Sequence, residues 1–116
     1  MQYLLLIYEA ESVGEAMSDQ EKAEMFQGYM AFTEHIRESG EWLGGEALTP
    51  VHTATSVRVR EGRTRLTDGP FAETREQLGG YYLVECKDLD RANELAAMIP
   101  TAKTGTIEVR PIMKWE

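Results

Sequence analysis

Several residue types and motifs that mark common functional classes are rare or missing in this chain. The single cysteine, Cys86, cannot form an intramolecular disulfide, and we expect a buried, unreactive thiol in a reducing compartment. The two histidines, His35 and His52, have no second histidine or cysteine at metal-ligand spacing, so we expect no metal site. No GxGxxG or GxxxxGKS/T loop occurs, and we expect neither a bound nucleotide nor another cofactor.

An excess of positive charge and a long hydrophobic run are also lacking. The 116 residues carry a net charge of −8, which argues against nucleic acid or a membrane surface as a partner. The apolar run at residues 1–8 is too short to span a bilayer and has no basic residue before it, unlike a signal peptide. We therefore expect one cytoplasmic domain over residues 1–116.

Hydrophobic periodicity and turn residues predict alternating strands and helices. Residues 18–21, Ser-Asp-Gln-Glu, form a capping box at the start of the first helix, and Gly40 ends that helix. Asp88 or Asp90 caps the second helix, and Pro100 marks its end. The predicted strands cover residues 1–8, 41–48, 78–86 and 106–113, with a hairpin at 54–67 and a loop at 9–17. The predicted buried stripes are Met25, Tyr29, Phe32, Thr33 and Ile36 in the first helix and Leu89, Ala92, Leu95, Ala96 and Ile99 in the second.

Glycine and proline residues interrupt the predicted strands at defined places. Gly44 and Gly45 indicate a bulge, or a point where another backbone or a ligand approaches closely. Pro111 cannot donate a ladder hydrogen bond, which indicates an edge strand or the point where pairing stops.

The order of the elements predicts the fold. Two split β-α-β units separated by a hairpin are typical of an α+β, ferredoxin-like βαββαβ antiparallel sheet with both helices on one face. The other sheet face would stay uncovered, although the strands are rich in Tyr, Trp and Leu. We therefore expect a homodimer in which two sheets pack face to face.

The hairpin is expected to have two chemically different faces. If Glu61 and Gly62 form a two-residue turn, Asp68 lies at the end of the apolar face and looks inward. The apolar face then carries Val57, Val59 and Leu66, and the other face carries Arg58, Arg60, Arg63 and Arg65. Like charges opposite one another are destabilising, so these arginines require an anionic ligand or acids of the dimer, unless they spread apart into solvent.

The run Asp-Gly-Pro-Phe-Ala-Glu-Thr-Arg-Glu-Gln-Leu-Gly-Gly-Tyr at residues 68–81 resembles the signature of the DGPFAETKE proteins, a bacterial branch of the YCII-related family. Arg75 stands where the name-giving motif has lysine, and the resemblance extends over the whole chain. It implies a dimeric α/β barrel within a superfamily that includes small monooxygenases and lactone isomerases. Some members of this branch are encoded beside extracytoplasmic-function sigma factors, which implies a signalling or stress role.

Asp68 and Tyr29 are the candidate catalytic residues. Loss of solvent would suit the Asp68 carboxylate to acid/base chemistry, although Asp-Gly-Pro is also a common turn. Tyr29 stands where the YCII proteins proper carry a histidine of a suspected His–Asp dyad, and it is either a hydrogen-bond partner of Asp68 or a core residue. The candidate ligand-binding residues are Arg58, Arg63 and Arg65 of the hairpin and Gly69, Pro70 and Phe71 of the motif.

Two functions are compatible with these residues. One is a small cofactor-independent enzyme that acts on an anionic small molecule in a pocket between sheet and helices, with Asp68 as acid/base. The other is a non-catalytic dimeric module that binds a ligand or assists a sigma factor or another transcription factor.

Overall fold

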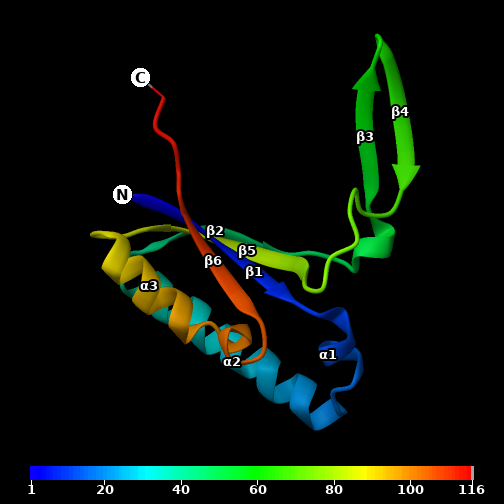
Figure 1. Ribbon diagram of the computed structural model, residues 1–116. Coiled ribbons are helices and arrows are strands. Elements are labelled where there is room, and N and C mark those ends of the chain that lie inside the picture. Colours follow the sequence, from blue (N-terminus) through cyan, green and yellow to red (C-terminus); the bar gives the residue numbers. More distant parts are fainter. Residues whose placement is uncertain (116) are drawn as a thin grey trace.

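The computed structural model describes residues 1–115 and has the predicted α+β, ferredoxin-like architecture (Figure 1). A four-stranded antiparallel sheet has the strand order β2-β5-β1-β6, and helices α2 and α3 cover the same face of it. The strands are β1 (Gln2–Glu9), β2 (Trp42–Ala47), β3 (Thr55–Arg60), β4 (Arg63–Asp68), β5 (Gln77–Glu85) and β6 (Thr106–Pro111). The helices are α1 (Glu11–Glu15), α2 (Asp19–Glu38) and α3 (Leu89–Met98), with short 3-10 helices η1 (Val51–Thr53) and η2 (Pro100–Lys103). Within residues 1–115 no helix is long and apolar enough to cross a membrane.

The two central strands, β1 and β5, alternate between the helix-covered face and the open face of the sheet. Tyr3, Leu5 and Ile7 of β1 are buried on the helix side, and Leu5 is the sheet neighbour of Tyr82 in β5. The Phe32 ring of α2 meets the Tyr82 ring edge to face, with 5.0 Å between the centroids. The core is therefore a single layer between the sheet and the helices.

The predicted helix caps are confirmed. The Glu21 backbone N–H donates to the Ser18 hydroxyl at 3.1 Å, and the Ser18 backbone N–H donates to the Glu21 carboxylate at 3.0 Å. The hydrogen bond from the Ser18 backbone N–H to the carboxylate holds the pKa of Glu21 below its ordinary value. Gly40 has a φ of 79° just after α2, and the Asp88 carboxylate caps α3 by accepting from the Arg91 backbone N–H at 2.9 Å.

Two predictions about helical segments were wrong. The expected loop at residues 9–17 contains α1, a short helix held by tertiary contacts: the Glu11 carboxylate accepts from the Val51 N–H, and the Glu11 N–H donates to the Gln77 side chain, both at 2.9 Å. Leu89 belongs to the predicted buried stripe of α3 but is 48% exposed, because α3 begins at the rim of the molecule (Figure 1).

The irregular features of the outer strands follow the prediction. The pairing of β2 with β5 shifts register between Trp42 and Gly44, as a bulge does. Strand β6 is an edge strand and ends at Pro111, two residues before the predicted end. The backbone N–H of Ile112 still donates to the Gln2 carbonyl at 3.0 Å, after which the chain leaves the sheet.

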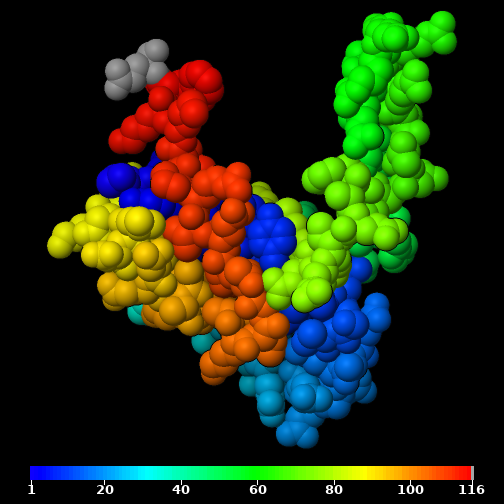
Figure 2. All heavy atoms as spheres, viewed as in Figure 1, coloured from blue at the N-terminus to red at the C-terminus, as the bar shows by residue number. Residues whose placement is uncertain are grey.

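The hairpin has the predicted register and forms a sheet of its own. Val57 pairs with Leu66 and Arg58 with Arg65, and the turn has φ values of 53° at Glu61 and 75° at Gly62. Within residues 1–115, strands β3 and β4 pair with each other and with no other strand, and they project away from the body (Figures 1 and 2). We call residues 55–68 the arm.

A half-buried ion pair joins the start of β2 to α3, and its loss is expected to depend on pH. Arg91 donates two hydrogen bonds to the Glu41 carboxylate, at 2.8 and 2.9 Å, which lower the pKa of Glu41. We expect Glu41→Gln to reduce the free energy of unfolding by about 1–2 kcal/mol at pH 7. Because the folded pKa is depressed, this contribution is present above the unfolded glutamate value of about 4.3 and disappears as the pH falls through the folded value.

Urea unfolding of both proteins over a pH series tests this expectation. The exposed Glu38→Gln substitution at the end of α2 is the matched control and should change little. A stability difference between wild type and Glu41→Gln that stays constant into acid would contradict the assignment.

Candidate functional site

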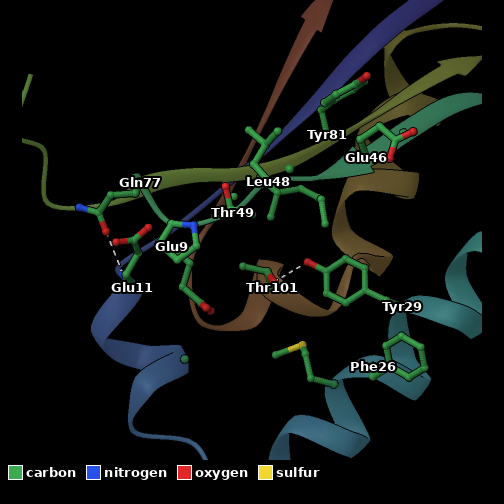
Figure 3. A pocket seen from close by; sticks show the side chains of 18 of the residues that line it. Glu9, Glu11, Phe26, Tyr29, Glu46, Leu48, Thr49, Gln77, Tyr81 and Thr101 are labelled. Atoms are coloured by element: carbon green, nitrogen blue, oxygen red, sulfur yellow. Dashed lines mark hydrogen bonds between the residues drawn. The ribbon is translucent and has the colours of Figure 1, made fainter. Parts of the chain in front are cut away.

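An open cavity of about 770 Å³ lies between the sheet and α2, where the sequence predicted a pocket (Figure 3). Helix α1 and residues 48–50 contribute to its walls. Much of the lining is apolar, with contributions from Met17, Met25, Phe26, Trp42 and Leu48. The volume and the largely apolar walls fall within the range that is typical of small-molecule sites in proteins.

A pair of hydroxyl groups supplies a partly buried polar contact in the wall of the cavity. The Tyr29 hydroxyl of α2 and the Thr101 hydroxyl of η2 are 2.5 Å apart (Figure 3). Thr101 is 5% exposed, and burial raises the pKa of Tyr29, so its phenol stays protonated at neutral pH. The pair can therefore both donate to and accept from a neutral polar group of a ligand.

The charged residues of the lining are mostly acidic: Glu9, Glu11, Glu15 and Glu46, with Lys22 as the basic residue. The Glu9 carboxylate accepts a hydrogen bond from the Thr104 hydroxyl, and Glu11 is held by Val51 as described above. The net charge of the chain is also negative. A negative potential at the cavity disfavours an anionic ligand and favours a neutral or cationic one.

Two glycines bring β2 and β5 close together along the wall of the cavity. A Cβ atom on Gly45 would lie 2.8 Å from the Tyr81 carbonyl oxygen, and one on Gly80 would lie 2.9 Å from the Glu46 carbonyl oxygen. Both distances are too short for real side chains, so glycine is required at these positions. The predicted close approach of another backbone at Gly45 is confirmed, and it keeps this wall free of side-chain bulk.

Of the predicted site residues, only Tyr29 lines the cavity. Asp68 is exposed at the end of β4, so the predicted inward orientation and loss of solvent are not found within one chain. The Tyr29 hydroxyl is paired with Thr101 and not with Asp68. The other candidates also lie outside the lining: Arg58, Arg63 and Arg65 on the arm, and Gly69, Pro70 and Phe71 just after it.

Asp68 and the arginines of the arm lie outside the cavity because the arm projects away from the body. Strand parity correctly predicted which arm residues share a face, but it cannot say where that face points. The Gly69 N–H donates to the Ala54 carbonyl at 2.7 Å, and the Ser56 hydroxyl donates to the Gly69 carbonyl at 2.8 Å. These bonds close the base of the arm, and Asp68, the last residue of β4, stays exposed and outside the lining of the cavity. Its catalytic role stays a prediction without support from this geometry.

Sequence reasoning missed two residues that contribute to the cavity. Glu9 could have been found, because it continues the inward alternation of Tyr3, Leu5 and Ile7 along β1. Thr101 carried no comparable signal, because it lies in the short 3-10 helix η2 after α3 and reaches Tyr29 only through the packing of α2 on η2.

Other reactive groups lie outside the cavity. His35 and His52 are not part of its lining, and Cys86 is buried just after β5, where burial raises the pKa of its thiol. No group of three or more His, Cys, Asp and Glu side chains in the described part of the chain is arranged to hold a metal ion.

Comparison with known proteins agrees with the fold and places the chain in a family. The family model of the YCII-related domain matches residues 1–116. An uncharacterised protein of Rhizobium meliloti (strain 1021) is 39% identical over 114 residues, which cover 97% of this chain and 92% of that protein. A match over the whole chain, together with the ferredoxin-like sheet, shows that this protein belongs to the YCII-related family.

Proposed function

We propose that this YCII-related protein binds a small organic molecule in the cavity between the sheet and α2. The observation that carries the proposal is the cavity itself: about 770 Å³ of open space with largely apolar walls and a partly buried hydroxyl pair in one wall. The ligand would place its apolar body against Met25, Phe26 and Leu48 and a polar group near Tyr29 and Thr101.

The charges around the cavity narrow the class of ligand. Four glutamates and one lysine in the lining favour a neutral or cationic molecule over the anion that the arginines of the arm led us to expect. Electrostatics therefore supports the binding-module alternative more strongly than an Asp68-based enzyme for an anionic substrate. The ionisable groups available for chemistry in the cavity are its glutamates, Lys22 and tyrosine phenols such as that of Tyr29.

A matched series of fluorescent probes tests the proposal. Dansylamide is neutral, dansylcadaverine is cationic and dansylglycine is anionic, and all three share one fluorophore. In a Trp115→Phe background, the tryptophan left is Trp42, which lines the cavity and can transfer energy to a bound dansyl group. We expect the neutral and cationic probes to bind and the anionic probe to bind several-fold more weakly.

Three substitutions test where the probe binds. Ala47 lines the cavity, and Ala47→Phe is expected to fill part of it and weaken probe binding by about tenfold or more. Ala23→Phe is the same change on an exposed position of α2 outside the lining, and it should leave binding unchanged. Tyr29→Phe should cost about 1 kcal/mol of affinity for a probe that uses the hydroxyl.

The opposite pattern would refute the proposal. If dansylglycine binds best and Ala47→Phe has no effect, the ligand site lies outside the cavity, with the exposed arginines of the arm as its first candidate.

A further inference from the structure

The arm exposes a row of apolar side chains that the body of its own chain does not cover. Val57 is 60% exposed, Val59 is 59% exposed and Leu66 is 68% exposed. These residues share one face of the β3–β4 hairpin, as their pairing shows. A two-stranded hairpin by itself is marginally stable in water, so an arm of this length needs a surface to pack on.

The opposite face of the arm carries a concentration of positive charge that is also uncompensated. Arg58 lies directly opposite Arg65, and Arg60 directly opposite Arg63. Within residues 1–115 none of these four guanidinium groups forms an ion pair. Like charges in this arrangement are destabilising unless an acidic surface lies near them.

The part of the chain outside the arm carries the excess of negative charge. The arm has four arginines and two acidic residues, for a net charge of +2, which leaves −10 on the remainder of a chain whose net charge is −8. The arm points away from its own body, so the body of another copy offers the matching negative charge (Figure 2). Charge complementarity of this kind makes the surface self-complementary.

The open face of the four-stranded sheet exposes apolar side chains that can pack against the apolar row of the arm. Leu4 of β1 and Leu83 of β5 are direct neighbours on this face, and both are only half-buried. The arm rises from one end of the sheet on this side, opposite the helices, and the chain end after β6 rises from the other end (Figure 1). That chain end exposes Met113 by 71% and Trp115 by 88%.

The chain is more extended than a compact domain of the same length. The radius of gyration is 16.2 Å, whereas a compact domain of this size has about 13 Å. The difference arises because the arm and the chain end extend beyond the body and leave a space over the open sheet face (Figure 2).

We propose that the arm is an exchanged dimerisation element, which packs its Val57, Val59 and Leu66 row against a second copy of this chain. A two-fold axis places two such arms in one dimer, so that each copy both gives and receives an arm. The apolar row meets the apolar open-face side of the partner, and the arginines come close to its acidic surface. The Asp-Gly-Pro-Phe segment then serves as the root of the arm, with Phe71, 80% exposed, beside the contact. This inference does not depend on the ligand proposed for the cavity.

Sedimentation velocity at micromolar concentration tests the arm directly. We expect the wild-type protein to sediment as a dimer of about twice 13.1 kDa and Leu66→Asp to shift it to monomer, with at least about tenfold weaker association. Leu89→Asp is the matched control, because Leu89 is an exposed leucine on α3, on the helix-covered side of the molecule. It should leave the dimer unchanged.

A second variant covers the case in which Leu66→Asp disturbs folding. Residues 55–68 are replaced by a short Gly-Ser linker between Ala54 and Gly69, whose backbones are already hydrogen-bonded at 2.7 Å. A folded monomer, with its circular dichroism and its cavity probe binding retained, supports the proposal.

Three results would overturn it: a monomeric wild-type protein, a dimer that persists without the arm, or equal loss of the dimer in Leu66→Asp and Leu89→Asp. A wild-type monomer that binds heparin through the arginines would assign the arm to a polyanion instead.

Discussion

Replacing Ile36 by alanine is expected to lower the free energy of unfolding by about 2–5 kcal/mol, the range for deletion of a large aliphatic side chain from a core. Ile36 is fully buried on α2 and belongs to the one cluster that joins this helix to β1, β5 and α3. The cavity left behind can collapse only if α2 moves toward the sheet. The better helix propensity of alanine offsets less than 1 kcal/mol of this loss.

Urea denaturation followed by circular dichroism measures the effect. Met30→Ala removes an apolar side chain from the same helix at a position that is 58% exposed, and it should change stability by less than about 0.5 kcal/mol. Equal losses at the two positions would mean that α2 is not held to the sheet by this stripe.

Gly80→Ala is the second change with a large expected effect, at about 1–3 kcal/mol of destabilisation. Its Cβ atom would lie 2.9 Å from the Glu46 carbonyl oxygen and 3.4 Å from the Ala47 Cα. Both contacts are with the backbone of β2, so the clash cannot be relieved by rotating a side chain. Strand β2 must move away from β5, which also changes the wall of the cavity. We therefore expect weaker binding of the dansyl probes together with lower stability.

The neighbouring glycine provides the control. A Cβ atom on Gly79 has the Ile7 carbonyl oxygen as its nearest contact, at 4.0 Å, and Gly79 does not have a positive φ. Gly79→Ala should be neutral or stabilise the fold by about 0.4–1 kcal/mol, because it restricts the unfolded chain. If both substitutions destabilise equally, the cost comes from the loss of glycine flexibility and not from the close approach of β2.

The residues that line the cavity could be predicted from the sequence only in part. Tyr29 was found because helical spacing places it on the buried stripe of α2. Thr101 was missed because its role depends on a contact across 72 residues. Asp68 was proposed as a catalytic residue because it lies at the end of the apolar face of the hairpin. In the structure this hairpin is the arm, which projects away from the body and the cavity.

The arm shows the same division between local and tertiary information. The turn at Glu61 and Gly62 requires positive φ values, so turn chemistry alone predicted the pairing of the strands that flank it. The surface that the apolar row of the arm contacts is not encoded by any local pattern. In the proposed dimer, that surface belongs to another copy of the chain.

The sequence by itself determined the order of strands and long helices, their caps, the hairpin register and the ferredoxin-like arrangement. These depend on hydrophobic period, capping side chains and glycine conformation, which act over a few residues. Only the tertiary structure decided that α1 forms, that a cavity opens beside Tyr29, and that the signature at residues 68–81 begins at the root of an exposed arm. Each of these depends on contacts between distant segments, such as Glu11 with Val51 and Tyr29 with Thr101, whose geometry no single stretch of sequence specifies.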